Sequence, residues 1–205
     1  MNNKPLFITF EGIEACGKST QAKMLNDYLI AKGQKVLLTR EPGGPNISEK
    51  IRSILLDPEN KEMTAETELL LYLASRNQHT AEWILPALNE GNIVICDRYF
   101  DSTFAYQGVA RKIDLDIIKQ INNFATFGLV PDITFVLDIS VEMSILRQKG
   151  KKLDRMESES IDFHEAVRRA YLEIAKENNR YVIIDGSKNV DEIHEIVGNA
   201  FIRSV

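Results

Sequence analysis

The sequence predicts an α/β fold in which a five-stranded parallel sheet carries helices on both faces. Two observations lead to it. Five short apolar runs lack the alternation of half-exposed strands, which is typical of strands that are covered on both sides. Stretches with helical periodicity separate these runs, and strand–helix alternation gives right-handed crossovers in a doubly wound sheet. We expect one domain over residues 1–205.

The strands are expected in five runs rich in Val, Ile, Leu and Phe. In chain order these are "LFITF" (6–10), "KVLLTR" (35–40), "NIVICDR" (92–98), "ITFVLDI" (133–139) and "YVIID" (181–185). Ligands of such sheets bind beyond the carboxyl ends of the strands. One cleft is therefore expected among the loops that start at Glu11, Arg40, Asp97, Asp138 and Asp185.

The helices follow from 3.6-residue periodicity between these strands. They are expected at residues 18–33, 47–56, 64–90, 114–125, 140–148, 162–178 and 189–202. Gly33, Gly91 and Gly128 come just after three of these helical patterns, where a left-handed C-cap is expected.

Composition excludes several classes of protein. The 25 basic and 30 acidic residues give a net charge of -5, which argues against a nucleic-acid partner. No apolar run approaches the roughly 18 residues of a membrane span, and the start of the chain lacks the basic region of a signal peptide. We expect a cytoplasmic protein without a membrane partner. Cys16 and Cys96 are expected to be free thiols, and no Cys/His spacing indicates zinc.

The first loop carries a phosphate-binding motif. Residues 12–19 read G-x-x-x-x-G-K-[ST] between an expected strand and an expected helix, the context that the motif requires. Lys18 should bridge the β and γ phosphates of a nucleoside triphosphate, and the Ser19 hydroxyl should bind Mg²⁺. The predicted triphosphate-binding residues are Gly12, Ile13, Glu14, Ala15, Cys16, Gly17, Lys18, Ser19 and Thr20.

Other loops indicate what the phosphate is used for. "TREPGG" (39–44) and "DRYFDSTFAYQG" (97–108) follow the second and third strands, and the basic stretch "RQKGKKLDR" (147–155) precedes a helix. This is the layout of a nucleotide kinase. A switch GTPase would need an Asn-Lys-x-Asp loop, which is absent. A non-catalytic nucleotide-binding module would need neither Asp97–Arg98 nor the basic stretch.

The chain resembles the bacterial thymidylate kinases. The resemblance lies in "FEGIEACGKSTQ", "TREPGG", "LLLYLASRNQH", "DRYFDSTFAYQG", "PDITFVLD" and "LDRMESESIDFHEAVRRAYLEIA". It implies the P-loop nucleoside monophosphate kinase fold, phosphoryl transfer from MgATP to dTMP as a step in dTTP synthesis, and a homodimer. Residues 114–130 or 69–73 are candidates for the dimer face. Another nucleoside monophosphate or deoxynucleoside kinase is the rival interpretation.

The resemblance also implies roles for individual residues. Arg98 and Arg52 would bind the acceptor phosphate, with Asp97 serving the metal. Tyr72 would stack on the base and Arg76 would contact its carbonyl; the two are four residues apart and share a helix face. The implied dTMP-binding residues are Glu14, Glu41, Pro42, Arg52, Tyr72, Arg76, Arg98, Thr103, Tyr106 and Gln107. Among them Tyr106 would crowd the sugar 2′ position, and Glu14 would face the 3′-hydroxyl or a metal-bound water.

The transition-state arginine is expected in a basic lid at about residues 147–158, because the variable positions of the phosphate loop hold no arginine. The candidates are Arg147 and Arg155. We favour Arg147 as the mobile group and Arg155 as a donor-phosphate or structural contact. Lys149, Lys151 and Lys152 cannot make the bidentate contact of an arginine. A phosphate acceptor needs no general base, so the three histidines are expected to be surface or capping residues.

Overall fold

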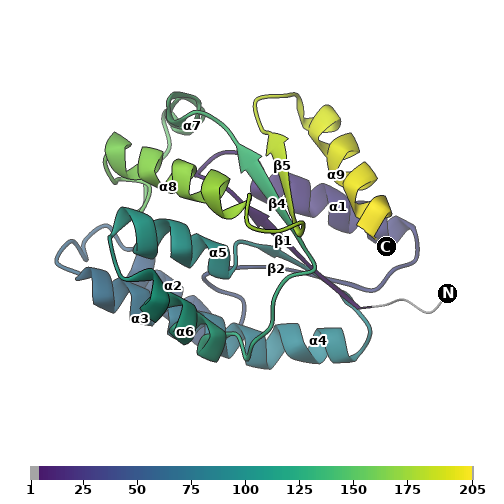
Figure 1. The fold of residues 1–205 in the computed structure, drawn as a ribbon, viewed down its shortest axis with the longest axis horizontal. Coiled ribbons are helices and arrows are strands. Elements are labelled where there is room, and N and C mark those ends of the chain that lie inside the picture. The colour runs from purple at the N-terminus through teal and green to yellow at the C-terminus, as the bar shows by residue number, and fades with distance from the viewer. Residues whose placement is uncertain (1–4, 205) are drawn as a thin grey trace.

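The structure is a computed structural model that describes residues 5–204. Its five parallel strands are β1 (Leu6–Glu11), β2 (Val36–Arg40), β3 (Ile93–Asp97), β4 (Ile133–Asp138) and β5 (Tyr181–Asp185). They are ordered β2-β3-β1-β4-β5, with β1 in the centre (Figure 1). The register places Phe10 beside Asp97 and Glu11 beside Val136, so the loops after β1, β3 and β4 start at one edge. The predicted sheet is confirmed.

Helices cover both faces of this sheet (Figure 1). The helices are α1 (Lys18–Ala31), α2 (Asn46–Leu56), α3 (Ala65–His79), α4 (Leu85–Asn89), α5 (Phe100–Thr103), α6 (Leu115–Ala125), α7 (Val141–Gln148), α8 (Ile161–Ile174) and α9 (Val190–Ser204). Five of them begin at an N-cap side chain that accepts a backbone N–H, namely Thr64, Asp114, Ser140, Ser160 and Asn189. Gly33, Gly91 and Gly128 have φ between 72° and 79°, as the C-cap pattern predicts.

Most expected elements lie within a few residues of the observed ones, although the helix expected at 162–178 already ends at Ile174. Two segments differ more. The expected helix 64–90 is divided by a π-helical turn, η1 (Thr80–Ile84), just before Pro86, which has no N–H to continue the α-helical ladder. The loop after β3 forms α5 and a second π-helical stretch, η2 (Phe104–Ala110), which periodicity did not predict. These short elements carry three of the predicted site residues, Thr103, Tyr106 and Gln107.

The core has one large cluster and two smaller ones. The large cluster joins β1, β4, α1, α8 and α9 through residues such as Phe10, Phe135 and Val167. A second cluster packs η1 and α4 against β1 and β3, and a third joins α3 to α6 through Leu69, Leu73, Ile118 and Ala125. Over residues 5–204, no helix is long and apolar enough to cross a membrane.

Candidate active site

The phosphate-binding loop lies between the carboxyl end of β1 and the first turn of α1. Gly12 (φ 135°) and Gly17 (φ 104°) allow its bends, and a Cβ on Gly12 would lie 2.4 Å from the carbonyl oxygen of Leu137 on β4. The Lys18 ammonium curls back over the loop and donates to the carbonyls of Gly12 (3.1 Å) and Ile13 (2.8 Å). The loop therefore has the backbone geometry that cradles phosphates at a helix N-terminus.

Ser19 and Asp97 form the oxygen-rich corner of the site. Strand pairing places the end of β3 beside β1, so the Asp97 carboxylate accepts a hydrogen bond from the Ser19 hydroxyl. A hydroxyl and a single carboxylate suit Mg²⁺, which is commonly bound by one or two carboxylates together with substrate phosphates and water. Among residues 5–204, no cluster of three acidic, His or Cys side chains forms a complete metal cage.

Arg98 follows Asp97 with φ 71°, a left-handed conformation that is uncommon outside glycine. Its guanidinium donates to the Gly12 carbonyl (2.9 Å), the Tyr171 hydroxyl (3.0 Å) and the Glu14 carboxylate (3.0 Å). A strained backbone that is held by several partners is typical of functional sites.

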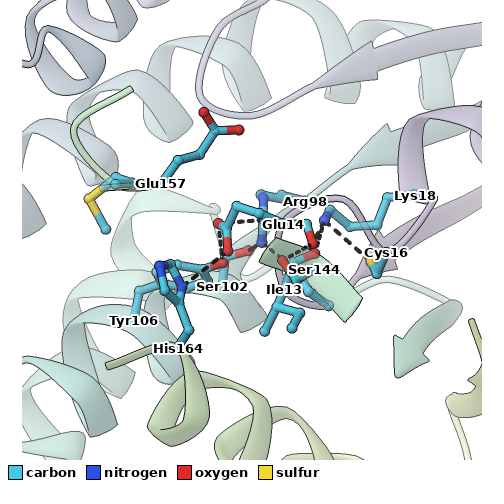
Figure 2. A network of polar contacts seen from close by, with 12 residues as sticks. Ile13, Glu14, Cys16, Lys18, Arg98, Ser102, Tyr106, Ser144, Glu157 and His164 are labelled. Atoms are coloured by element: carbon cyan, nitrogen blue, oxygen red, sulfur yellow. Dashed lines mark hydrogen bonds and ion pairs between the residues drawn. The ribbon is translucent and has the colours of Figure 1, made fainter. Parts of the chain in front are cut away.

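Glu14 lies at the centre of the polar network in Figure 2. Its Oε1 accepts from the Tyr106 hydroxyl (2.5 Å) and from Arg98, while Oε2 lies 3.4 Å from His164 Nδ1. Burial alone would raise the pKa of this carboxyl. The contact with His164, the nearby charges of Arg98 and Lys18, and the Tyr106 hydrogen bond outweigh burial and lower the pKa to about 2. Glu14 is therefore an anion at neutral pH.

A second carboxyl, Glu11, lies deeper and has the opposite shift. It accepts from the Tyr99 backbone N–H (2.7 Å), the Ser102 hydroxyl (2.7 Å) and the Tyr171 hydroxyl (2.9 Å). Burial, followed by repulsion from Asp101, raises its pKa to about 7. Sequence analysis identified Glu11 only as the start of a loop; its position at the last residue of the central strand was the available signal.

Two cavities open from the phosphate loop. The first has a volume of about 260 Å³ and extends from Lys18 and Ser19 toward α3 and η2. Its lining includes nine of the ten predicted acceptor residues: Glu14, Glu41, Pro42, Arg52, Tyr72, Arg98, Thr103, Tyr106 and Gln107. The Glu41–Pro42 peptide bond is cis, and Arg52 donates to the Pro42 carbonyl (2.6 Å). The structure thus brings together residues from five separate segments of the chain.

Arg76 is the predicted acceptor residue that does not line this cavity. Its side chain is only 2% exposed and lies immediately behind the wall. It donates to the carboxylate of Glu41 (2.7 Å), the hydroxyl of Thr103 (2.7 Å), the amide oxygen of Asn122 (2.9 Å) and the carbonyl of Tyr99 (3.0 Å). Arg76 therefore fixes Glu41 and Thr103, two groups that do face the cavity.

The second cavity, of about 490 Å³, lies on the other side of the loop. It shares Ala15, Lys18 and Ser19 with the first cavity. The rest of its lining is Cys16, Gly17, Thr20, Gln21, Arg147, Lys151, Gly186, Lys188, Val190 and Ile193. Arg147 donates to the carbonyls of Ala15 (3.2 Å) and Gly186 (2.9 Å). Several cations thus surround the side of the loop opposite the acceptor residues.

Arg155, the other lid candidate, is held away from the loop. Its guanidinium donates to Glu68 (2.7 Å) and to the Leu55 carbonyl (2.8 Å). Glu68 is 1% exposed and also accepts from Arg111 and Gln107. Sequence analysis missed Glu68, although it lies one turn before Tyr72 on the same helix.

Two of the three histidines contradict the expectation of surface or capping positions. His79 is fully buried between the Thr39 hydroxyl (2.8 Å) and the Glu41 carboxylate (3.1 Å). His164 is 7% exposed and faces Glu14. Burial was not predictable because both contacts join segments more than 35 residues apart. His194 is partly exposed and lies edge-on to Tyr28 on α1.

Comparison with known proteins agrees with this geometry. A family model described as Thymidylate kinase matches residues 10–197. Thymidylate kinase from Geotalea daltonii is 51% identical, covering 96% of both chains, and that from Caldanaerobacter subterraneus subsp. tengcongensis is 48% identical, covering 95% of this chain and 93% of the relative. The crystal structure of thymidylate kinase from Ehrlichia chaffeensis superimposes with a TM-score of 0.78 at 36% identity, covering 96% of this chain and 98% of that one. The chain belongs to the thymidylate kinase family.

Proposed function

We propose that the protein transfers the γ-phosphoryl group of MgATP to dTMP, giving dTDP and ADP, as a step in dTTP synthesis. The observation that carries this proposal is the pair of cavities that meet at Ala15, Lys18 and Ser19. Phosphoryl transfer requires a donor and an acceptor in line across one set of phosphate ligands. Two cavities on opposite sides of one phosphate loop provide that arrangement.

ATP is assigned to the cavity that Arg147, Lys151 and Lys188 line. The backbone of residues 12–20 would hold its phosphates, with the Lys18 ammonium on the β and γ oxygens. Ser19 and Asp97 would hold Mg²⁺, which offsets the charge of the phosphates when bound. These assignments follow from a hydroxyl and a carboxylate in direct contact beside the phosphate loop.

dTMP is assigned to the cavity that contains Arg98, Arg52 and Tyr72. Arg98 reaches the phosphate loop from β3, so its guanidinium is suited to a bidentate contact with the acceptor phosphate near Lys18. Arg52 lies further along the same wall. Three arginines, Arg40, Arg52 and Arg98, and one lysine, Lys18, line this small cavity and offset the repulsion between two polyanions.

The base and the sugar would lie deeper in the same cavity. Tyr72 supplies an aromatic face for thymine, and Thr103 and Gln107 supply polar contacts to its edge. Glu41 and Pro42 form the floor, and Arg76 acts on the base from behind the wall by holding Thr103 and Glu41 in place. Tyr106 is held by Glu14 beside Arg98, which suits a wall against a 2′-hydroxyl, while Glu14 faces the 3′ side of the sugar.

Arg147 is our candidate for the transition-state arginine. It lies in the donor cavity and is exposed, and its two hydrogen bonds are to backbone carbonyls. A guanidinium held by neutral partners can move onto the transferring phosphoryl group without breaking an ion pair. Arg155 is paired with the buried Glu68, which supports a structural role for it.

A homodimer is supported by the outer face of α2, α3 and α6, which pack beside one another (Figure 1). These three helices carry large apolar side chains that are exposed, among them Leu70 (63%), Phe124 (80%), Ile47, Ile54 and Ile117. Leu69 and Leu73 belong to the core instead, so only part of residues 69–73 is available for contact. Contiguous exposed apolar area is typical of an interface. A cytoplasmic location and the absence of a nucleic-acid partner remain expectations from the sequence.

The decisive assay measures ADP release from ATP and Mg²⁺ with dTMP, dUMP, dCMP, dGMP, AMP and thymidine as separate acceptors. We expect strong turnover with dTMP, weaker turnover with dUMP and very little with the others. Preference for thymidine or for another monophosphate would contradict the assignment of the acceptor cavity. It would leave the phosphate loop and the fold unaffected.

A further inference from the structure

His164 and Glu14 form a contact that the catalytic proposal does not use. Nδ1 of His164, on α8, lies 3.4 Å from Oε2 of Glu14, in the phosphate loop. Both side chains are almost buried, at 8% and 11% exposure. Within residues 5–204, neither of these two atoms has a hydrogen-bond partner of its own. A buried nitrogen and a buried carboxylate oxygen that face each other are stabilised when the nitrogen carries a proton.

The two carboxylate oxygens of Glu14 have different contacts. Oε1 is bound by Tyr106 and Arg98, two residues that line the acceptor cavity. Oε2 points the other way, toward His164 (Figure 2). His164 therefore decides whether the second oxygen of a carboxylate at the acceptor cavity is neutralised.

His164 also connects Glu14 to the loop between α7 and α8, residues 149–160. The backbone of Glu157 and the carboxylate of Glu159 both favour the protonated form of the imidazole and raise the pKa of His164. Glu157 also lines the acceptor cavity, so the two groups that favour the protonated imidazole, Glu14 and the Glu157 backbone, belong to two segments of its wall. The other charges near the pair are Arg98 and Lys18, which act on Glu14.

Protons from solvent can reach this imidazole. His164 forms part of the lining of a groove of about 670 Å³ between α7, the 149–160 loop and the start of α8. The groove brings solvent to a ring that is otherwise buried, and His164 lines this groove and not the acceptor cavity. The protonation of His164 can therefore follow the pH of the medium.

We propose that His164 is a positioning residue whose imidazolium fixes the Glu14 carboxylate at the acceptor cavity and ties it to the 149–160 loop, so that dTMP is used less well once the imidazole is neutral. This proposal rests on the function proposed above. It concerns how the acceptor nucleotide is held and leaves the donor cavity unaffected.

The direction of the pH effect follows from the two groups. Burial lowers the pKa of His164, but the contacts with Glu14 and the Glu157 backbone outweigh burial and raise it above the ordinary value of 6.5. Glu14, with a pKa of about 2, stays ionised. The ion pair is thus complete below pH 6.5 and is lost as the pH rises through the raised pKa of His164.

The first test measures the pair without using catalysis. The chain has three histidines, so imidazole NMR titrations of the full protein can be assigned by the signal that disappears in His164→Gln. We expect the His164 midpoint to lie above 6.5 and to fall in Glu14→Gln, which removes the charge but keeps the shape of the side chain. His194 should titrate identically in both proteins. An unchanged His164 midpoint in Glu14→Gln would overturn the proposal.

The second test measures how the acceptor is used. KM for dTMP and for ATP would be measured from pH 6 to 8.5 in the natural protein, in His164→Gln and in the control His194→Gln. At each pH, the KM of a variant for dTMP is divided by the KM of the natural protein for dTMP. This ratio cancels the second ionisation of the dTMP phosphate, whose pKa is about 6. We expect KM for dTMP to be higher in His164→Gln at pH 6, by up to about tenfold for each unit by which the pair raises the pKa.

The difference should disappear above the His164 midpoint, while KM for ATP and the His194→Gln values stay as in the natural protein. A His164→Gln protein with the natural KM for dTMP at pH 6 would overturn the proposal. An increase in KM for dTMP that is equal at pH 6 and pH 8.5 would also overturn it, because it would show a structural role. The same holds for an increase in KM that is equal for ATP and dTMP. Absence of dTMP phosphorylation in the natural protein would refute the proposed function, and the NMR titration would still decide whether the pair exists.

Discussion

Arg147 and Arg155 belong to the same basic segment, but the structure gives them different partners, so their replacement should have opposite effects. Arg147 is exposed and donates to two backbone carbonyls. Its replacement by alanine removes hydrogen bonds at the surface, each worth about 1 kcal/mol or less. If it supplies the transition-state charge, the loss of kcat should be about a thousandfold or more.

Arg155→Ala should behave in the reverse way. It removes a charged hydrogen bond to Glu68, which is 1% exposed. Because Arg111 still pairs with Glu68, the carboxylate is not left alone. The free energy of unfolding should therefore fall by about 2 to 3 kcal/mol, which is typical of the loss of one charged hydrogen bond. The loss is smaller than that for a buried charge left without any partner. We expect kcat to change by less than about tenfold, well below the loss of an arginine at the transition state.

The assays are ADP release with saturating dTMP and ATP for kcat, and urea denaturation for stability. Arg169→Ala is a matched control, because Arg169 is an exposed arginine on α8 outside both cavities. It should leave both quantities within experimental error. If Arg155→Ala were as stable as the natural protein but inactive, and Arg147→Ala were active, the assignment of the transition-state arginine would be refuted.

Three further changes test other parts of the site. Lys18→Ala should lower turnover by several orders of magnitude while circular dichroism stays unchanged; near-normal turnover would contradict the phosphate-loop assignment. Arg76→Ala should raise KM for dTMP far more than KM for ATP, and equal effects would remove Arg76 from the acceptor site. Glu11 has a folded-state pKa of about 7 against 4.5. Its contribution to the free energy of unfolding is present below pH 4.5 and falls by about 3 kcal/mol by pH 7. Glu11→Gln should lack this fall in urea titrations, and an identical pH profile would contradict the burial argument.

The parts of the fold that depend on local pattern were predictable from the sequence. The five strands are uniformly apolar because both faces of a parallel sheet are covered, and the structure confirms each of them. The phosphate loop was equally accessible, because Gly12 and Lys18 belong to a motif with a fixed spacing. Local steric requirements of this kind can be predicted directly from the residue types and their spacing.

Contacts across long sequence distances were not predictable. Arg76 was expected to contact the base carbonyl, but it is surrounded by groups from the loop after β2, from α5 and from α6. His79 and His164 looked like surface residues for the same reason, because Glu41 and Glu14 approach them only after the chain has folded. Charge partners of buried residues depend on packing between elements, which periodicity does not encode.

The glycines that touch β4 limit how this protein can change under selection. A side chain on Gly12 would collide with the Leu137 carbonyl, and one on Gly186 would lie 2.9 Å from Ile139 and 3.2 Å from the Cys16 carbonyl. Substitution at either position would force strand β4 and the phosphate loop apart. An inhibitor that draws its affinity from the backbone at Gly12 and Gly186 would therefore leave few routes to resistance. An inhibitor that relies on the exposed side chains of Lys149 and Lys152 would instead contact positions where a substitution does not disturb the packing.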